Sequence, residues 1–584
     1  MVGIAAGVSA AGESSVADTG ACIVRLVAFA RAYGLIEPGD ERWAYNTVCA
    51  LVGFRGPDPL AAGHDLLRAG NPADRCTGAF APGAPTAGFA DGEPAVPSPD
   101  TLLHPLAREA SRRGTLAGDP DDAAVFERFS AQVMGALMPR PAQVARGFER
   151  REAHGPRQAT DWLYRLSCAA DYVRGAAVAR NLRWETPTPW GRLEITVNRA
   201  KPEKDPRAIA QAAAAPAPTA ASTDGDGAAE ASVYPACPLC WENEGYAGRG
   251  PQDAAGAWPP RQNLRIVPLL LGGEYWGLQY SPYAYFPEHC IVLSAAHRPM
   301  RIDRDACGRL LEFVERFPHY FLGANADLPV VGGSILSHDH FQGGCHTFPL
   351  MTAPCEPPVP WPDHPQVRLQ AVRWPVSVLR LSAPPAYAEE LLDAVEAVRA
   401  CWDDYDDASA GIVSHADDGT RHNAITPICY RAGENLVFDV ALRCNVTSAE
   451  HPLGVFHPHA CWHHIKKENI GLIEVMGLAV LPGRLVPELD AVADVLCRAA
   501  GPQGAAALDA LEADPLCAPH AAWARQVFAR HDGAREDVRA VLRYEVGLVF
   551  SQVLEDAGVF KADFAGHVAQ ARFLHALGAG ASAL

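Results

Sequence analysis

The chain has 584 residues and a mass of 62.3 kDa, which allows three or four compact units at about 150 residues per domain. It is 48% hydrophobic and 20% charged, which excludes a wholly disordered chain. The formal charge of −18 argues against a general nucleic-acid-binding protein. No apolar stretch approaches the roughly 20 residues of a membrane-spanning helix, and the N-terminus lacks the basic region of a signal peptide. We therefore expect a soluble cytoplasmic protein with no nucleic-acid or membrane partner.

The N-terminal part of the chain has the apolar spacing of helices. Residues 1–180 are predicted to be mainly helical, because apolar side chains recur at helical intervals in 23–33, 125–134 and 161–180. Between them, 70–100 is rich in Gly, Pro and Ala, which predicts a loop or an insertion.

Strand-like patterns begin at residue 191. In 191–198, Leu193, Ile195 and Val197 alternate with polar residues, as in a half-buried strand. The run of Ala, Pro, Thr and Gly at 208–232 has almost no large apolar side chain and is predicted to be a flexible linker or a surface insertion.

The middle of the chain contains the same mixture of elements twice. Strands are predicted at 264–271, 289–293 and 328–336, with a helix at 306–317. A helix at 387–403, a strand at 436–443 and an apolar run at 470–481 follow. Because each half also has a His-x-His after sheet-like sequence, we predict a pseudo-duplicated α+β core. The tail from 486 is predicted to be helical.

The densest chemical motif is the segment 332–344. If residues 334–342 are extended, then His338, His340 and Gln342 share one face, and Asp339 points away from it. Glycine pairs flank the motif and would let the backbone approach phosphate oxygens. Two imidazoles and an amide beside such a loop favour phosphoryl transfer through a histidine nucleophile. The alternative is a pair of hydrogen-bonded histidines in a polar loop.

Two other motifs point to a metal and to an anionic ligand. Cys237 and Cys240 have the spacing of zinc ligands, and histidines would complete the site because no second Cys-x-x-Cys exists; a redox pair or an inert pair is the alternative. Four histidines in 457–464, followed by Lys466 and Lys467, concentrate basic groups as a sugar-phosphate pocket requires, although a solvated basic loop would look the same.

Several stretches together resemble the galactose-1-phosphate uridylyltransferases (UDP-glucose–hexose-1-phosphate uridylyltransferases), specifically their second bacterial family. The resemblance extends from about residue 161 to 561, and the first 150 residues match weakly. It is carried by 195–206, 241–249, 263–268, 325–344, 454–459 and 463–477.

The resemblance implies an α+β fold with two histidine-triad-like antiparallel-sheet halves, a helical N-terminal region and a helical C-terminal tail. We predict four parts: a helical region 1–180, a first half 181–360 with the nucleophile and a zinc site, a second half 361–485 on the hexose-phosphate side, and a helical region 486–584.

The implied reaction has a ping-pong mechanism. UMP passes from UDP-glucose to an enzyme histidine and then to galactose 1-phosphate, which yields UDP-galactose and glucose 1-phosphate in the Leloir pathway of galactose metabolism. The resemblance also implies a homodimer. The alternatives are another histidine-triad-type nucleotidyltransferase or phosphorylase, and a non-catalytic sugar-nucleotide-binding protein.

The roles of individual residues follow from the same resemblance. The first family carries His-Pro-His-x-Gln, which makes His340 the nucleophile and Gln342 its phosphate-binding partner, with Asp339 in place of the proline. The implied zinc ligands are Cys237, Cys240, His297 and His338, with His289 as the alternative third ligand. The string His457-Pro-His459 lacks the glycines and the glutamine, so it is predicted to be a second metal site or part of the hexose-phosphate pocket. The implied substrate-binding residues are Arg199, Lys201, Asn325, Ser334, Lys467, Gly471 and Glu474.

Overall fold

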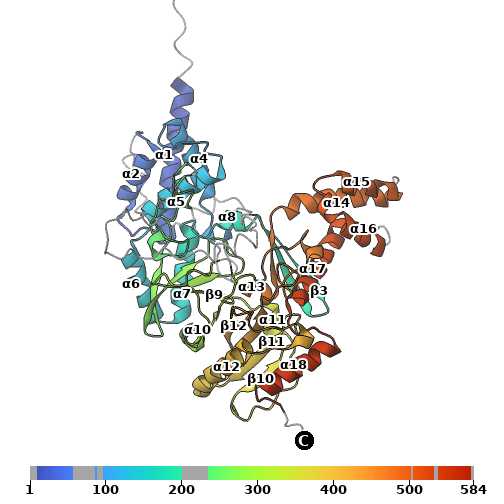
Figure 1. Cartoon of the computed structure of the whole chain (residues 1–584). Coiled ribbons are helices and arrows are strands. Elements are labelled where there is room, and N and C mark those ends of the chain that lie inside the picture. The colour runs from blue at the N-terminus through green and yellow to red at the C-terminus, as the bar shows by residue number, and fades with distance from the viewer. Residues whose placement is uncertain are drawn as a thin grey trace, which may run out of the picture. The chain divides into compact units, whose positions relative to one another are not determined.

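The computed structural model describes residues 9–56, 86–87, 96–199, 234–250, 252–333, 335–501, 504–531 and 537–580 (Figure 1). Helices and strands mix in the middle of the chain and helices form both ends, which confirms the α+β fold class. The chain divides into two compact units: Met1–Ala179, Ala220–Leu269 and Trp276–Cys290 form one, and Arg180–Thr219, Leu270–Tyr275 and Ile291–Leu584 form the other. The four-part division remains a prediction. The predicted linker 208–232 and most of the predicted insertion 70–100 lie outside the described residues.

The N-terminal region is helical, as predicted. In α1 the side chains of Ile23, Leu26, Val27 and Ala30 are buried, at the spacing of one helical face. The predicted helix 161–180 is shorter than expected, because α7 ends at Ala169 and Asp171 has a left-handed φ of 55°. The helices of this region are α1 (Ser9–Ala32), α2 (Glu41–Val52), α4 (Asp100–Arg112), α5 (Ala123–Leu137), α6 (Pro141–Glu152), α7 (Pro156–Ala169) and α8 (Gly175–Val178), and a small ladder joins β1 (Thr86–Ala87) to β2 (Val96–Pro97).

A nine-stranded sheet is the centre of the fold. Its strand order is β10-β11-β13-β12-β8-β9-β7-β6-β5. The strands are β5 (Val267–Leu271), β6 (Glu274–Tyr280), β7 (Cys290–Ser294), β8 (Phe321–Gly323), β9 (His340–Gly344), β10 (Arg368–Ala371), β11 (Val378–Ala383), β12 (Asn423–Ala432) and β13 (Asn435–Cys444). Predicted strands at 264–271, 289–293 and 436–443 therefore correspond to β5, β7 and β13.

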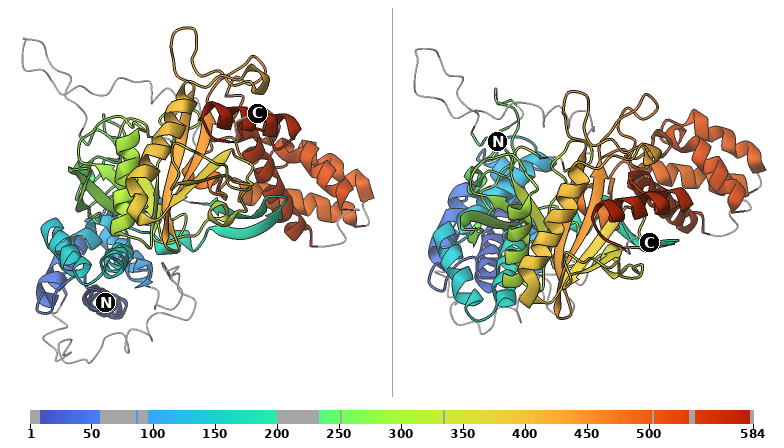
Figure 2. Two further views of the ribbon diagram at one scale, coloured as in Figure 1. Left: turned by 90° about the horizontal axis from the view of Figure 1, so that it is seen from below. Right: turned by 60° about the horizontal axis from the view of Figure 1, so that its bottom comes forward.

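The order of elements supports the predicted duplication. Outward from the antiparallel pair β8 and β12, one side of the sheet continues as β9, β7 and β6, and the other continues as β13, β11 and β10. In each series one helix precedes the central strand: α10 (Arg304–Arg316) precedes β8, and α12 (Ala388–Asp403) precedes β12. These two helices lie side by side and pack against β12 (Figure 2). The duplication does not extend to the histidines, because β13, the counterpart of β9, contains none.

The segment 328–336 is not a strand, contrary to the prediction. Its described residues, 328–333 and 335–336, form a loop, and β9 begins only at His340. Pro329 has no N–H to donate to a ladder, and Val330 has a left-handed φ of 73°. The apolar residues of the loop serve another purpose, since Val331 packs against Ala326 and Ala424.

A second, three-stranded sheet has the order β14-β4-β3. Its strands are β3 (Leu182–Thr188), β4 (Gly191–Asn198), which is the strand predicted at 191–198, and β14 (Leu478–Pro482), which runs parallel to β4. The apolar run 470–481 thus divides into a short helix, α13 (Leu472–Val475), and β14. Helix α17 (Val538–Ala557) packs on β3 so closely that a Cβ on Gly547 would lie 2.1 Å from the Thr186 hydroxyl.

The C-terminal region is helical, as predicted. No helix in the described ranges is long and apolar enough to cross a membrane. The remaining α-helices in the described ranges are α11 (Pro349–Thr352), α14 (Leu485–Ala500), α15 (Ala510–Ala513), α16 (Ala521–Arg530), α17 (Val538–Ala557) and α18 (Phe564–Ala576).

Candidate active site

His340 is the first residue of β9 and is buried. Its Nδ1–H donates a hydrogen bond of 2.7 Å to the main-chain carbonyl of His338. This bond fixes the tautomer, so the lone pair lies on Nε2. Strand alternation places Gln342 on the same face as His340, whereas the side chain of Phe341 is buried on the other face.

The imidazole of His340 is neutral over the physiological range. Burial lowers the pKa of His340 to about 4, against the opposing effect of the His338 carbonyl. A neutral ring with a lone pair on Nε2 can attack phosphorus without first losing a proton.

His338 has the complementary arrangement. Its Nε2–H donates a 2.8 Å hydrogen bond to the main-chain carbonyl of Ser294, the last residue of β7. The nitrogen left for a ligand is therefore Nδ1. Main-chain carbonyls commonly orient histidine ligands of metals in this way.

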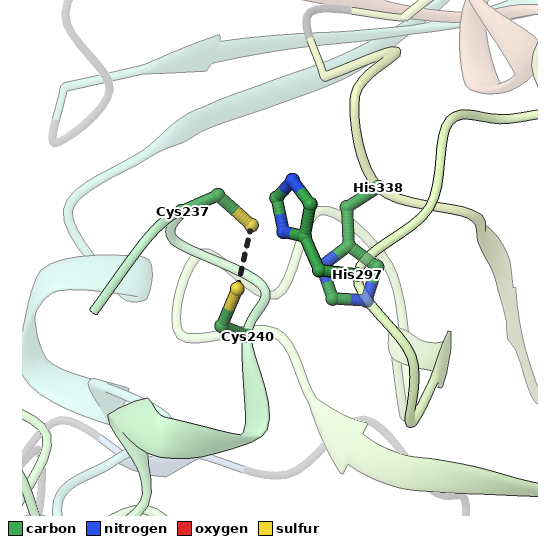
Figure 3. Close-up of side chains that lie close together, drawn as sticks. All are labelled: Cys237, Cys240, His297 and His338. Atoms are coloured by element: carbon green, nitrogen blue, oxygen red, sulfur yellow. Dashed lines mark hydrogen bonds between the residues drawn. The ribbon is translucent and has the colours of Figure 1, made fainter. Parts of the chain in front are cut away.

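The structure brings together the four residues implied as zinc ligands (Figure 3). One ligand atom from each of Cys237, Cys240, His297 and His338 lies within 4.8 Å of all the others, and the two Sγ atoms are 3.4 Å apart. The hydrogen bond with Cys240 lowers the pKa of the Cys237 thiol. Two thiols and two imidazoles are a donor set of structural zinc sites, so the residues fit this metal. His289 lies outside the cluster, and no second group of this kind occurs in the described ranges.

Asn325 joins the loop 325–333 to the segment that contains α13. Its Oδ1 accepts a 2.8 Å hydrogen bond from the main-chain N–H of Leu472. A Cβ on Gly333 would lie 2.6 Å from Asn325 Nδ2, and a Cβ on Gly471 would lie 2.9 Å from Oδ1. A side chain at either position would therefore displace the Asn325 amide, which the glycines allow to lie against the backbone.

The two lysines of the basic segment have different surroundings. Lys466 is buried, and its Nζ lies 2.9 Å from Glu474 and 3.4 Å from Glu468. Although burial opposes it, the two carboxylates raise the pKa of Lys466. Glu474 also accepts a 3.3 Å hydrogen bond from the N–H of Gly471. Lys467 is only half-buried. Lys466 therefore balances buried acids, and Lys467 is the lysine with access to solvent.

The second His-x-His has other partners. His457 lies 3.4 Å through Nε2 from Asn469 Oδ1, and His459 lies 3.2 Å through Nδ1 from Asp556. His459 Nε2–H also donates to the Val455 carbonyl. Burial lowers the pKa of His457 to about 4, and it does the same for His464, so these two rings do not supply the positive charge that the motif suggested. Within the described part of the chain, neither His457 nor His459 belongs to a group of metal-type ligands.

The other implied substrate residues can be located only in part. Arg199 is exposed at the end of β4, and its main-chain N–H is bonded to Asn181 Oδ1. Lys201 and Ser334 lie outside the described residues.

Sequence reasoning missed two arginines near these segments. Arg298, which follows His297, forms a 3.2 Å ion pair with Asp339. Arg443 on β13 is fully buried, and its Nε and Nη1 have no hydrogen-bond partner in the described part of the chain. Burial lowers the pKa of Arg443 to about 10, against the attraction of Glu474. An arginine inside an otherwise apolar strand was the available signal for Arg443, and adjacency to His297, a candidate metal ligand, was the signal for Arg298.

Comparison with known proteins identifies the family of the chain. The model of the galactose-1-phosphate uridyl transferase N-terminal domain matches residues 92–299, and that of the C-terminal domain matches residues 312–523. The galactose-1-phosphate uridylyltransferase of Bacillus subtilis is 46% identical over 82% of this chain and 87% of its own length. The enzyme of the same name from Lacticaseibacillus casei is 45% identical over 83% of this chain and 92% of its own. The chain therefore belongs to the galactose-1-phosphate uridylyltransferase family of enzymes.

Proposed function

We propose that this protein transfers UMP from UDP-glucose to galactose 1-phosphate through a covalent uridylyl group on His340. The observation that carries the proposal is the hydrogen bond from His340 Nδ1–H to the His338 carbonyl. That bond leaves Nε2 as an unprotonated nucleophile in a buried position, inside the motif that the family relationship selects.

In the first half-reaction, Nε2 of His340 attacks the α-phosphorus of UDP-glucose. An N–P bond forms while the bond from the α-phosphorus to the bridging oxygen breaks, and glucose 1-phosphate leaves with that oxygen. In the second half-reaction, a phosphate oxygen of galactose 1-phosphate attacks the same phosphorus and UDP-galactose forms. The N–P electron pair returns to Nε2, so the enzyme is regenerated without net gain or loss of a proton.

The chain supplies groups for each end of the substrate. We assign the uridine and its phosphate to Arg199, Lys201 and Ser334, and the transferred phosphate to Gln342 beside the nucleophile. Lys467 is assigned to the phosphate of the hexose, supported by its solvent access next to the buried ion cluster of Lys466.

We assign two roles, substrate contact and shaping of the substrate pocket, to Asn325, Gly471 and Glu474. The second role is supported by the hydrogen bonds of Asn325 and Glu474 to the main chain around α13. We assign a structural zinc to Cys237, Cys240, His297 and His338, where the metal would anchor the ligand segments. The reaction itself is carried by side chains and main-chain groups of the protein.

The test uses UDP-glucose radiolabelled in the α-phosphate. We expect denatured protein to retain a single uridylyl group per chain, and galactose 1-phosphate to discharge it as labelled UDP-galactose. Glucose 1-phosphate should discharge it as UDP-glucose. If UDP-glucose leaves no label while a dinucleoside polyphosphate does, the protein is a different nucleotidyltransferase. If no nucleotide leaves label although UDP-glucose binds, the protein is a sugar-nucleotide-binding protein.

A further inference from the structure

We propose that Arg298 and Asp339 are positioning residues that fix the orientation of the His340 imidazole by holding the peptide unit between His338 and Asp339. The inference rests on His340 as the nucleophile in the proposed function. Neither residue needs to touch substrate for this role.

The peptide unit in question has both of its polar ends engaged. Its carbonyl, from His338, accepts the 2.7 Å hydrogen bond from His340 Nδ1. Its N–H, from Asp339, donates a 2.7 Å hydrogen bond to the main-chain carbonyl of Arg298. Because the unit is planar, the bond at the N–H end determines where the carbonyl points. The Arg298 carbonyl thus directs the group that fixes the tautomer of His340.

The side chains reinforce the same alignment. Asp339 Oδ2 accepts a hydrogen bond of 3.2 Å from Arg298 Nε, and the carboxylate is 6% exposed. The Asp339 carbonyl accepts a 2.9 Å hydrogen bond from the N–H of Ser294. Residue 339 is therefore held at its N–H, its carbonyl and its carboxylate, each time by the segment 294–298.

Arg298 is anchored in turn to regular elements. Its two terminal nitrogens donate to the two carboxylate oxygens of Glu274, at 3.2 and 2.7 Å. Glu274 opens β6 and also receives Arg309 of α10 at 3.3 Å. The guanidinium therefore links the loop before β9 to a strand and a helix, and a fork of this kind has a fixed geometry that a lysine cannot reproduce.

Strand alternation explains how Asp339 can act without entering the reaction. Its side chain points to Arg298, while His340 and Gln342 lie on another face of the segment. A proline at 339 would remove the N–H that bonds Arg298, so the aspartate is not interchangeable with the proline of the first family.

The experiment compares Arg298→Met, Arg298→Lys, Asp339→Asn and Asp339→Pro with the parent. Arg301→Met is the matched control, because Arg301 lies three residues after Arg298 in the same loop, pairs with Asp303 and has an 82% exposed side chain. Two quantities are measured: the single-turnover rate of uridylyl-enzyme formation at saturating UDP-glucose, and the Kd for UDP-glucose. Histidine nitrogen NMR, with the His340 signals assigned from a His340→Gln sample, reports the tautomer without requiring turnover.

We expect Arg298→Met to slow uridylyl transfer roughly 10- to 100-fold, since small displacements of a reacting group have effects of this size. The Kd for UDP-glucose should change less than about threefold, and the His340 signals should show a mixture of tautomers. Arg298→Lys and Asp339→Asn should be intermediate, Asp339→Pro should be the slowest, and Arg301→Met should match the parent.

Two results would overturn the inference. One is an unchanged His340 tautomer and transfer rate in Arg298→Met and Asp339→Pro. The other is a parallel loss of bound metal, melting temperature and UDP-glucose binding in all four variants, which would show a general structural role. If the parent forms no uridylyl-enzyme, the proposed function fails, and the NMR comparison still decides whether Arg298 and Asp339 orient the ring.

Discussion

The two His-x-His segments of this chain have similar sequences but different surroundings. In the first, His338 and His340 each donate one N–H to a main-chain carbonyl, which leaves Nδ1 of His338 beside three other metal-type ligands and Nε2 of His340 for chemistry. In the second, His459 engages both nitrogens, one with Asp556 and one with the Val455 carbonyl. His457 faces Asn469 through Nε2 and the Pro458 carbonyl through Nδ1.

The difference lies in the neighbours and not in the motif. A histidine becomes a nucleophile when one nitrogen is committed and the other is left with its lone pair, and it becomes a structural group when both are committed. We therefore predict that the literal string His-Pro-His marks the less reactive of the two segments. The following predictions test this contrast from the largest expected effect to the smallest.

The largest effect should come from the nucleophile itself. His340→Ala should lower the rate of uridylyl transfer by a factor on the order of 10⁴ or more, because the covalent route is lost. His459→Ala, the matched change in the second segment, should retain transfer within about tenfold, because it removes an anchor to Asp556 and no reacting atom. Rates are measured by radiolabelled UMP transfer, with folding checked by circular dichroism. Transfer by His340→Ala within tenfold of the parent would contradict the assignment.

The metal should depend on the cluster that includes His338 of the first segment, and not on the second segment. Cys237→Ser combined with Cys240→Ser should lose the bound zinc and melt about 5–10 °C lower, since structural zinc contributes directly to folding. His457→Gln combined with His459→Gln should retain the parent's zinc content. Metal analysis of the purified proteins and thermal melts provide the measurements. Loss of zinc from the double variant His457→Gln, His459→Gln would place a metal at the second His-x-His segment, where we assign none.

The neighbouring lysines should separate stability from activity. Lys466→Met removes the cation between two buried carboxylates, so unfolding free energy should fall by about 3–5 kcal/mol. Lys467→Met should leave stability nearly unchanged and slow discharge of the uridylyl-enzyme by galactose 1-phosphate roughly 10- to 150-fold, as expected for a lost charge-assisted phosphate contact. Denaturant unfolding and single-turnover discharge measure the two effects. Equal discharge curves for Lys467→Met and the parent would remove Lys467 from the hexose-phosphate pocket.

The smallest effect concerns the acid sensitivity of the second segment. His457 has a folded pKa of about 4 and an ordinary pKa near 6.5 when unfolded, so the unfolded chain binds its proton first as pH falls. The stability associated with neutral His457 is therefore complete above pH 6.5 and is lost between about pH 6.5 and 4, by up to roughly 3 kcal/mol. The difference in unfolding free energy between the parent and His457→Gln, followed from pH 7.5 to 5, should shrink or reverse as pH falls. A constant difference would show that His457 is not held neutral by burial.

The sequence predicted elements well where one face of a segment is buried. Alternation at Leu193, Ile195 and Val197 located β4, and helical spacing located α10 and α12 within one or two residues. The strand predicted at 328–336 was wrong, because an apolar run does not distinguish a strand from a loop whose apolar side chains are buried. Pro329 and the left-handed Val330 prevent a ladder there.

The sequence predicted which residues belong to the candidate site better than it predicted how they are held in place. Resemblance to a family selected His338, His340, Cys237, Cys240 and His297, and the structure brings the four metal-type ligands together. The sequence could not reveal that Lys466 is neutralised by buried acids, or that Arg298 holds Asp339 between the two histidines. Arg298 and Asp339 come from segments far apart in sequence, so spacing along the chain contains no information about their contact. The acids that pair with Lys466 are close to it in sequence, but only the fold shows that the three side chains are buried together.

The most direct test of the central claim is to locate the uridylyl group. Protein incubated with UDP-glucose labelled in the α-phosphate is denatured, digested under alkaline conditions that preserve phosphoramidates, and mapped by tandem mass spectrometry. We predict that the label is found on His340 and nowhere else, and that galactose 1-phosphate removes it before digestion. Label on His459, or on any other residue than His340, would contradict the account.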